Sequence, residues 1–357
     1  MYRVIQWGTG NVGTHALRAI VERADLELAG VKVYSEAKRG VDAGQLLGRE
    51  PIGIRCVTSL DEVLAIEADC VNYSALGSTK PGAFDEVVDE LCTLLRHGFN
   101  VTSSSLEHLV YPPIVPAAHE RLQKACADGA SSFFDTGINP GYTMDLWPLT
   151  LTRLSRSIER INVLEVVDMK AYDSVMGRQF MGFGLPPGQR TPLDEMHLAW
   201  ATSPFYASML ELADAMGVTI DTVRYVREEG LAERDTEVAI GILDAGTVTV
   251  NKMSYIGVVG GRDFFRHSWV WRMSDDVHPE WGVGDHWECH IEGDPEVTSR
   301  LELSTRFDAG RPVSLTVATL NVNAIPTLCA ARPGVYTNLS LPNFAGGYRT
   351  VDGVPAR

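Results

Sequence analysis

The sequence predicts an α/β protein in two parts: a doubly wound parallel sheet, followed by a second α+β domain built on a mostly antiparallel sheet. Strand-like and helix-like segments alternate over the first 140 residues, and such alternation is typical of a parallel sheet. From residue 219 on, segments with period-two hydrophobicity are separated by turn residues, which indicates antiparallel strands. At 357 residues, the chain is also longer than one hydrophobic core usually supports.

A glycine-rich turn joins the first strand to the first helix. Residues 3–7, RVIQW, are a short apolar strand, GTGNVG follows, and HALRAIVER has helical hydrophobic spacing. The G-x-G-x-x-G spacing at a strand-to-helix turn is typical of dinucleotide binding, because the helix N-terminus offers N–H donors to phosphates. We therefore expect a Rossmann domain. The predicted cofactor contacts of this turn are Gly8, Thr9, Gly10, Asn11, Val12 and Gly13.

The end of the second strand, LELAGVKVY, bears on the choice between NADP and NAD. NAD-binding sites usually carry an acidic residue there, which holds the ribose 2′-hydroxyl. Here Tyr34 and Ser35 end the strand, and Lys38 and Arg39 follow shortly after. A hydroxyl and two cations suit a 2′-phosphate, so we expect NADP, with NAD as the alternative. Lys38 and Arg39 could instead be solvated loop charges.

Three further loops leave the same sheet edge. The strands predicted at 69–73, 99–105 and 131–137 are parallel neighbours, so their carboxyl ends meet where such sheets bind ligands. The loops are SALGS, SLEHLVYPP and TGINPGY. From two of them, the expected contacts of the nicotinamide are Ala75, Leu76, Gly77, Asn139, Pro140 and Gly141.

The third loop, within TSSSLEHLVYPP, carries a candidate acid/base. Glu107 precedes a run of apolar residues and two prolines. Such neighbours exclude water and raise the pKa of a carboxyl group towards neutrality, as a general acid/base requires. His108 is the alternative acid/base, with Glu107 as its orienting group, and an ordinary surface loop is the third interpretation.

The second half changes character. We expect a long strand over SIERINVLEVVDM, a helical segment around 173–183, a Gly/Pro loop, helices within 193–216, and then antiparallel strands. A final helix over 317–334 is expected to pack back on the nucleotide domain. The predicted domains are 1–140, 141–316 and 317–357. Candidate substrate contacts, each of which could instead serve core packing or a dimer interface, are Tyr142, Trp147, Tyr172, Phe180, His197 and Trp200.

Composition excludes several function classes. The net charge of −15 argues against nucleic acid as a partner, because phosphate binding needs a basic surface. No apolar run is long enough to cross a bilayer, and the N-terminus lacks a signal-peptide pattern, so we expect neither a membrane partner nor secretion. Six scattered cysteines without a C-x-x-C pair indicate reduced thiols in a cytoplasmic protein. No cluster has metal-ligand spacing, so no metal is expected.

The chain resembles the dihydrodipicolinate-reductase-like oxidoreductases. The features that carry this resemblance are GTGNVG, the parallel nucleotide domain, the α+β domain and the returning helix. Within them, TSSSLEHLVYPP, GINPGY and NAIPTLCAARPG are similar to 2,4-diaminopentanoate dehydrogenase and the native amine dehydrogenases. The resemblance covers nearly the whole chain. It implies Glu107 as the catalytic acid/base, NAD(P)H-dependent reductive amination of a ketone or aldehyde by ammonia and its reverse, and a homodimer.

The sequence leaves more than one substrate and more than one reaction open. An amino-acid substrate needs a cation for its carboxylate, and Arg178 is the one candidate beside the aromatic stretches. Their apolar character favours a small ketone or aldehyde. The alternatives are a reductase of a preformed imine, an amino-acid-type substrate such as 2,4-diaminopentanoate, and a non-catalytic NADP-binding sensor.

Overall fold

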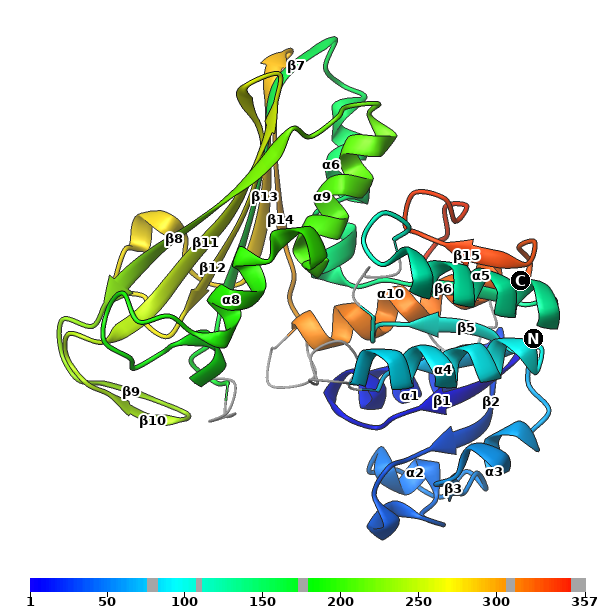
Figure 1. Ribbon diagram of the computed structural model, residues 1–357. Coiled ribbons are helices and arrows are strands. Elements are labelled where there is room, and N and C mark those ends of the chain that lie inside the picture. Colours follow the sequence, from blue (N-terminus) through cyan, green and yellow to red (C-terminus); the bar gives the residue numbers. More distant parts are fainter. Residues whose placement is uncertain (76–82, 107–110, 173–178, 306–311, 348–357) are drawn as a thin grey trace. The chain divides into compact units, whose positions relative to one another are not determined.

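The computed structural model describes residues 1–75, 83–106, 111–172, 179–305 and 312–347 (Figure 1). The chain divides into two compact units. Unit 1 comprises Met1–Tyr142 and Thr305–Arg357, and unit 2 comprises Thr143–Ser304. The first boundary lies close to the expected one, whereas the second falls at 304/305 instead of 316/317.

Unit 1 is built on a seven-stranded sheet with the order β15-β6-β5-β4-β1-β2-β3, and every pair of neighbours is parallel. The strands are β1 (Tyr2–Trp7), β2 (Leu26–Lys32), β3 (Cys56–Val57), β4 (Cys70–Tyr73), β5 (Asn100–Ser103), β6 (Ser132–Asp135) and β15 (Gly334–Tyr336). The chain winds in opposite directions from β1 and β4. This reversal is the switch point at which doubly wound sheets bind ligands.

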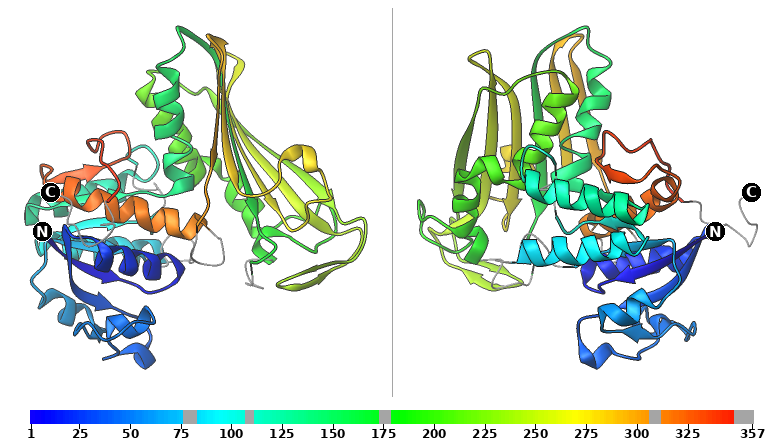
Figure 2. Two further views of the ribbon diagram at one scale, coloured as in Figure 1. Left: turned by 180° about the vertical axis from the view of Figure 1, so that it is seen from behind. Right: turned by 45° about the vertical axis from the view of Figure 1, so that its right-hand side comes forward.

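Helices cover both faces of this sheet (Figures 1 and 2). α1 (Asn11–Glu22) and α10 (Pro312–Cys329) bury Leu17, Ile20 and Ile325 in one core. α4 (Ala83–Arg96) and α5 (Pro116–Gly129) form the other core through an apolar stripe at helical spacing. The shorter elements of the unit are α2 (Ala43–Leu46), α3 (Leu60–Leu64), η1 (Glu36–Lys38) and η2 (Ile138–Tyr142).

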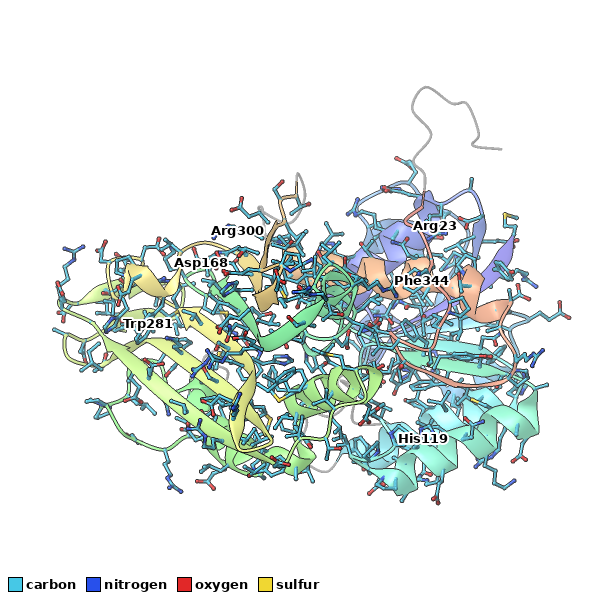
Figure 3. All side chains as sticks on the ribbon, turned by 90° about the horizontal axis from the view of Figure 1, so that it is seen from above. Arg23, His119, Asp168, Trp281, Arg300 and Phe344 are labelled. Atoms are coloured by element: carbon cyan, nitrogen blue, oxygen red, sulfur yellow. The ribbon has the colours of Figure 1, made fainter. Side chains whose placement is uncertain are left out.

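The end of the chain differs from the expectation. The last helix spans 312–329, not 317–334, and β15 follows it as an additional strand beside β6. A three-residue strand has too little hydrophobic pattern to be found in the sequence. Arg23, labelled in Figure 3, directly follows α1. Its guanidinium fixes the returning helix by donating to Asn323 Oδ1 at 2.8 Å.

Unit 2 is built on a six-stranded sheet with the order β14-β13-β7-β12-β11-β8. The strands are β7 (Ser157–Asp168), β8 (Thr222–Leu231), β11 (Val248–Val259), β12 (Arg262–Arg272), β13 (His286–Asp294) and β14 (Val297–Glu302). β7 and β12 are parallel, while the other neighbours are antiparallel. The sheet is therefore mostly antiparallel, and the predicted fold class is confirmed.

Helices also pack on this second sheet. They are α6 (Leu146–Thr152), α8 (Pro192–Leu198) and α9 (Pro204–Ala215). Met209 of α9 packs closely on β11, because a Cβ at Gly257 would lie 3.0 Å from the Met209 sulfur. One expected strand, TEVAIGILDA, is instead a hairpin of β9 (Thr236–Val238) and β10 (Gly241–Leu243). The chain turns at residues 239–240, and Gly241, which follows the turn, has a φ of +110°. Most of the helical segment expected around 173–183 lies outside the described residues.

The contact between α1 and α10 yields a test of unit 1. We expect Ile325→Ala to lower the free energy of unfolding by about 2–5 kcal/mol, because it leaves a cavity in a fully buried site. The matched control is Ile52→Ala, since Ile52 is 40% exposed and its loss should cost under about 0.5 kcal/mol. Chemical denaturation followed by circular dichroism measures both. Equal effects of the two variants would contradict the packing of α10 in this core.

Candidate active site

The glycine turn after β1 is tightly packed on its inner side. Gly8 has a φ of +87°, and a Cβ there would lie 2.6 Å from the carbonyl oxygen of Ser74. A Cβ at Gly13 would lie 2.3 Å from the carbonyl oxygen of Gly8. Both positions therefore exclude any larger residue, since real Cβ atoms do not approach so closely.

The outer side of the turn is open. Gly10 is the N-cap of α1, and a Cβ built on it would meet nothing within 4 Å. α1 runs for 12 residues, so the N–H groups of its first turn and its dipole are directed at this space. The turn fits the diphosphate of a dinucleotide, which needs a close approach to backbone donors.

Lys38 and Arg39 differ in what they contact. Lys38 Nζ donates to Thr9 Oγ1 at 3.1 Å, so this ammonium lies beside the glycine turn. Arg39 donates to Glu62 at 2.6 Å and to Thr58 at 3.0 Å. Of the two cations predicted to contact a 2′-phosphate, the structure thus brings Lys38 to the turn and gives Arg39 a carboxylate partner.

A buried lysine that sequence reasoning missed ends β2. Lys32 is 5% exposed, with its Nζ 3.2 Å from the centre of the Tyr34 ring and 4.6 Å from that of Trp7. Burial lowers the pKa of Lys32, and the two rings stabilise its charge through cation–π contacts. Trp7 Nε1 donates to the Tyr34 hydroxyl at 2.9 Å, while the Tyr34 residue is 58% exposed. The Tyr34 ring is therefore held in place by Trp7 and Lys32 and remains accessible to a ligand.

The loops after β4 and β5 are tied together. The Ser105 hydroxyl donates to the carbonyl oxygen of Ala75 at 2.7 Å, and Ser105 N–H donates to Ser103 Oγ at 3.0 Å. Leu106 N–H donates to the carboxylate of Asp135, which ends β6, at 3.2 Å. The described chain is thus anchored up to the residue before Glu107. The predicted site residues Leu76, Gly77, Glu107 and His108 lie outside the described residues.

The loop after β6 carries a buried amide. Neither polar atom of the Asn139 side chain has a hydrogen-bond partner among the described residues, although both are buried. Buried polar atoms are nearly always paired, so an unpaired amide at a ligand edge is a candidate contact for a bound group. Gly141 has a φ of +127° in the same loop. α10 holds the loop from behind, because Asn321 Nδ2 donates to the carbonyl oxygen of Thr136 at 3.1 Å.

The predicted substrate residues are found in different surroundings. Tyr142, at the end of unit 1, and Tyr172, in unit 2, are half-buried. Trp147 of α6 is 9% exposed and Phe180 is 37% exposed. Trp200 packs edge-on against the Tyr206 ring. Arg178, the candidate cation for a substrate carboxylate, lies outside the described residues.

His197 is enclosed by aromatic rings inside unit 2. It is 1% exposed and stacks on Tyr225 and Trp269, with Phe205 and Tyr255 also in contact. Its Nδ1 lies 2.9 Å from the Tyr255 hydroxyl. Burial lowers the pKa of His197 to about 4, so the ring is neutral at pH 7. A contact between His197 and the substrate stays a prediction.

An ion pair holds α8, the helix that carries His197, against β8. Arg227 of β8 pairs with Asp194 of α8 and with Glu229, and it is 13% exposed. Tyr225 donates to the same Asp194 carboxylate at 3.0 Å. With two carboxylates on one guanidinium, Arg227 is a structural cation and not a spare contact for a substrate carboxylate.

Two features are absent from the described residues. Within the described ranges, His, Cys, Asp and Glu form no group of three or more that could hold a metal ion. Among the helices that the structure describes, none combines the length and the apolar character needed to cross a membrane.

Comparison with known proteins now identifies the family. Residues 142–350 match the family model described as the 2,4-diaminopentanoate dehydrogenase C-terminal domain, which is more than half of the chain. The chain belongs to the 2,4-diaminopentanoate dehydrogenase family. The resemblance seen in the sequence is confirmed.

Members and neighbours of this family are similar to the chain over nearly its full length. An amine dehydrogenase from Streptomyces virginiae is 29% identical and covers 96% of both chains. A 2,4-diaminopentanoate dehydrogenase from Acetoanaerobium sticklandii is 25% identical over 95% of this chain and 93% of its own. The structure of an amine dehydrogenase from Mycobacterium smegmatis has the same fold, with a TM-score of 0.77, 20% identity, and coverage of 96% and 97%.

The buried histidines give unit 2 a predictable pH dependence. Burial also lowers the pKa of His267 to about 4, so both rings are neutral when folded but take up protons below about pH 6.5 when unfolded. The contribution of these neutral histidines to the free energy of unfolding is therefore fully present above about pH 6.5. Below that pH the free energy of unfolding decreases towards pH 4, by up to about 1.4 kcal/mol per pH unit for each histidine.

Denaturant unfolding between pH 7 and pH 4 measures this slope. We expect the free energy of unfolding of His197→Phe to change less steeply with pH than that of the wild type, because one proton-binding group is removed from the unfolded state. Identical slopes would contradict the neutral, buried state of His197.

Proposed function

We propose that this protein is an NAD(P)-dependent amine dehydrogenase that converts a small ketone or aldehyde and ammonia into an amine, and the amine back. The family and the amine dehydrogenase relative support an oxidoreductase of this class acting on amines. The observation that carries the proposal is the anchored loop that leads to Glu107. Ser105 and Leu106 are fixed by Ala75 and Asp135 at the sheet edge that holds the glycine turn.

The roles of the chain's own residues follow from this edge. The N-terminus of α1 and the Gly8–Gly10 turn bind the diphosphate. The Asn139 amide, buried without a partner among the described residues, is offered to the nicotinamide carboxamide or to the substrate nitrogen. When bound, the reduced nicotinamide supplies a hydride from its C4 atom.

Glu107 is the proposed acid/base. Its carboxylate takes a proton from ammonium, so that free ammonia attacks the carbonyl carbon. The carboxylic acid returns this proton to the hydroxyl of the carbinolamine, which leaves as water and yields an iminium ion. A carboxylate also stabilises that cation electrostatically. Hydride addition to the iminium carbon completes the amine, so that ketone, ammonium and reduced cofactor become amine, water and oxidised cofactor.

A small substrate without a carboxylate is favoured. Arg227 of unit 2 is engaged by Asp194 and Glu229, so it offers no free charge to a substrate carboxylate. The second candidate is an amino-acid-type substrate such as 2,4-diaminopentanoate, which the 25% identical relative supports. Activity on the diamino acid above that on every simple ketone would favour the second candidate.

Glu107 is the first residue to test. We expect Glu107→Gln to lower ammonia-dependent kcat by about 10²–10⁴-fold, the usual contribution of a general acid/base, while cofactor affinity is retained. His108→Gln is the matched control and should stay within a few-fold of wild type. NADPH oxidation with ammonia and a panel of short ketones and aldehydes measures both.

Three results would each reject part of this assignment. Full activity of Glu107→Gln would remove Glu107 from the mechanism. Turnover without ammonia would indicate a reductase of a preformed imine or carbonyl group. Cofactor binding without turnover on any substrate would indicate a sensor.

The cofactor is proposed to be NADP, with NAD as the alternative. The support is the Lys38 ammonium, 3.1 Å from Thr9 Oγ1 on the glycine turn. Such a cation can bind a 2′-phosphate through a charge-assisted hydrogen bond. A homodimer and a cytoplasmic location stay predictions.

Lys38 and Arg39 form a natural pair of test variants. We expect Lys38→Ala to lower kcat/KM for NADPH about 10-fold relative to NADH, because one charge-assisted hydrogen bond is worth about 1.5 kcal/mol or more. Arg39→Ala should change this ratio by less than about 3-fold, since Glu62 already binds the guanidinium. An unchanged ratio in Lys38→Ala would contradict the proposed NADP contact.

A further inference from the structure

Three polar side chains form a hydrogen-bonded row through the middle of the unit 1 sheet. Gln6 of β1, Asn72 of β4 and Thr102 of β5 are paired residue to residue across neighbouring strands. All three are 0% exposed. We call this set the polar row. Both faces of the sheet are covered by helices, so apolar side chains would be the ordinary choice at these positions.

The hydrogen bonds of the polar row run in one direction. The Thr102 hydroxyl donates to Asn72 Oδ1 at 2.9 Å, and Asn72 Nδ2 donates to Gln6 Oε1 at 2.7 Å. Gln6 Nε2 then donates to the carbonyl oxygen of Gly8 at 2.9 Å and to that of Trp7 at 3.2 Å. Each amide both accepts and donates, so the bonds polarise one another towards the glycine turn.

The final acceptor determines how one peptide group of the turn is oriented. In a trans peptide the C=O and the next N–H point in opposite directions. With the Gly8 carbonyl held against Gln6, the N–H of Thr9 is directed away from the buried sheet. The first turn of α1 closes over the same carbonyl, because a Cβ at Gly13 would lie 2.3 Å from it and 3.2 Å from Gln6 Nε2.

We infer that Gln6, supported by Asn72 and Thr102, is a positioning residue for cofactor binding, which presets the Thr9 N–H as a donor to the diphosphate. The inference rests on the proposed function only in that a dinucleotide binds at the glycine turn. Without the Gln6 amide, the Gly8–Thr9 peptide loses its fixed orientation, and the ordering cost falls on the binding step.

The test is cofactor affinity in Gln6→Met, which keeps the length of the side chain and removes its donors. We expect the Kd of NADPH, measured by calorimetry, to rise about 10-fold, while kcat at saturating cofactor changes by less than about 3-fold. Gln6→Glu, which keeps the shape but cannot donate to Gly8 when ionised, should weaken binding at least as much.

A matched control separates positioning from stability. Ser131 is 1% exposed, and its hydroxyl donates to the carbonyl oxygen of Leu95 at 2.8 Å. It directly precedes β6, so it lies at the amino ends of the strands, away from the glycine turn at their carboxyl ends. Ser131→Ala should lower Tm and leave the Kd of NADPH unchanged. If Gln6→Met does not fold, Thr102→Val decides, with an expected rise in Kd of about 3-fold and Thr102→Ser near wild type.

The outcomes are distinct. A Kd within 2-fold of wild type in folded Gln6→Met, or a rise no larger than that in Ser131→Ala, would overturn the positioning role and leave the proposed function intact. A wild-type protein that binds neither NADPH nor NADH would instead overturn the proposed function.

Discussion

The close contact between Gly8 and Gly13 is the constraint on which unit 1 depends. The 2.3 Å between a Cβ at Gly13 and the Gly8 carbonyl oxygen means that α1 begins directly on top of the turn that ends β1. That placement directs the helix N-terminus at the switch point between β1 and β4, where the neighbouring loops also arrive. A side chain at Gly13 would push the helix away from the turn, and the anion site between them would be lost.

The two units bury polar groups in different ways. In the polar row of unit 1 they are paired, since each of its two amides both accepts and donates a hydrogen bond. Unit 2 neutralises them, since His197 and His267 are held uncharged by burial, and the charge of Arg227 is balanced by carboxylates. Paired neutral amides keep the same hydrogen bonds at every pH, whereas buried histidines make stability depend on pH.

The sequence predicts much of unit 1 because its information is local. The glycine spacing, the strand before it and the helix after it are consecutive, and parallel strands then place the later loops at one edge. Pairing between distant segments is not local, so the parallel neighbours β7 and β12 and the short β15 were not foreseen. Gln6 and Lys32 were missed for another reason. A polar residue in a short strand looks exposed, and only the helices on both faces show that it is buried. Among the candidates of unit 2, DEMHLAW alone does not tell a pocket histidine from a core histidine.

The position of α10 bears on how the chain is made. Ala318, Val322 and Ile325 of α10 complete a core whose other buried residues come from the first 70 residues of the chain, and the whole of unit 2 is translated in between. At about 5–20 residues per second, the ribosome needs roughly 10–40 s to pass from residue 142 to residue 329. During that interval the nascent parallel sheet has one face without its full cover. A chaperone that shields apolar surface would find its binding site there, on the face that α10 later occupies.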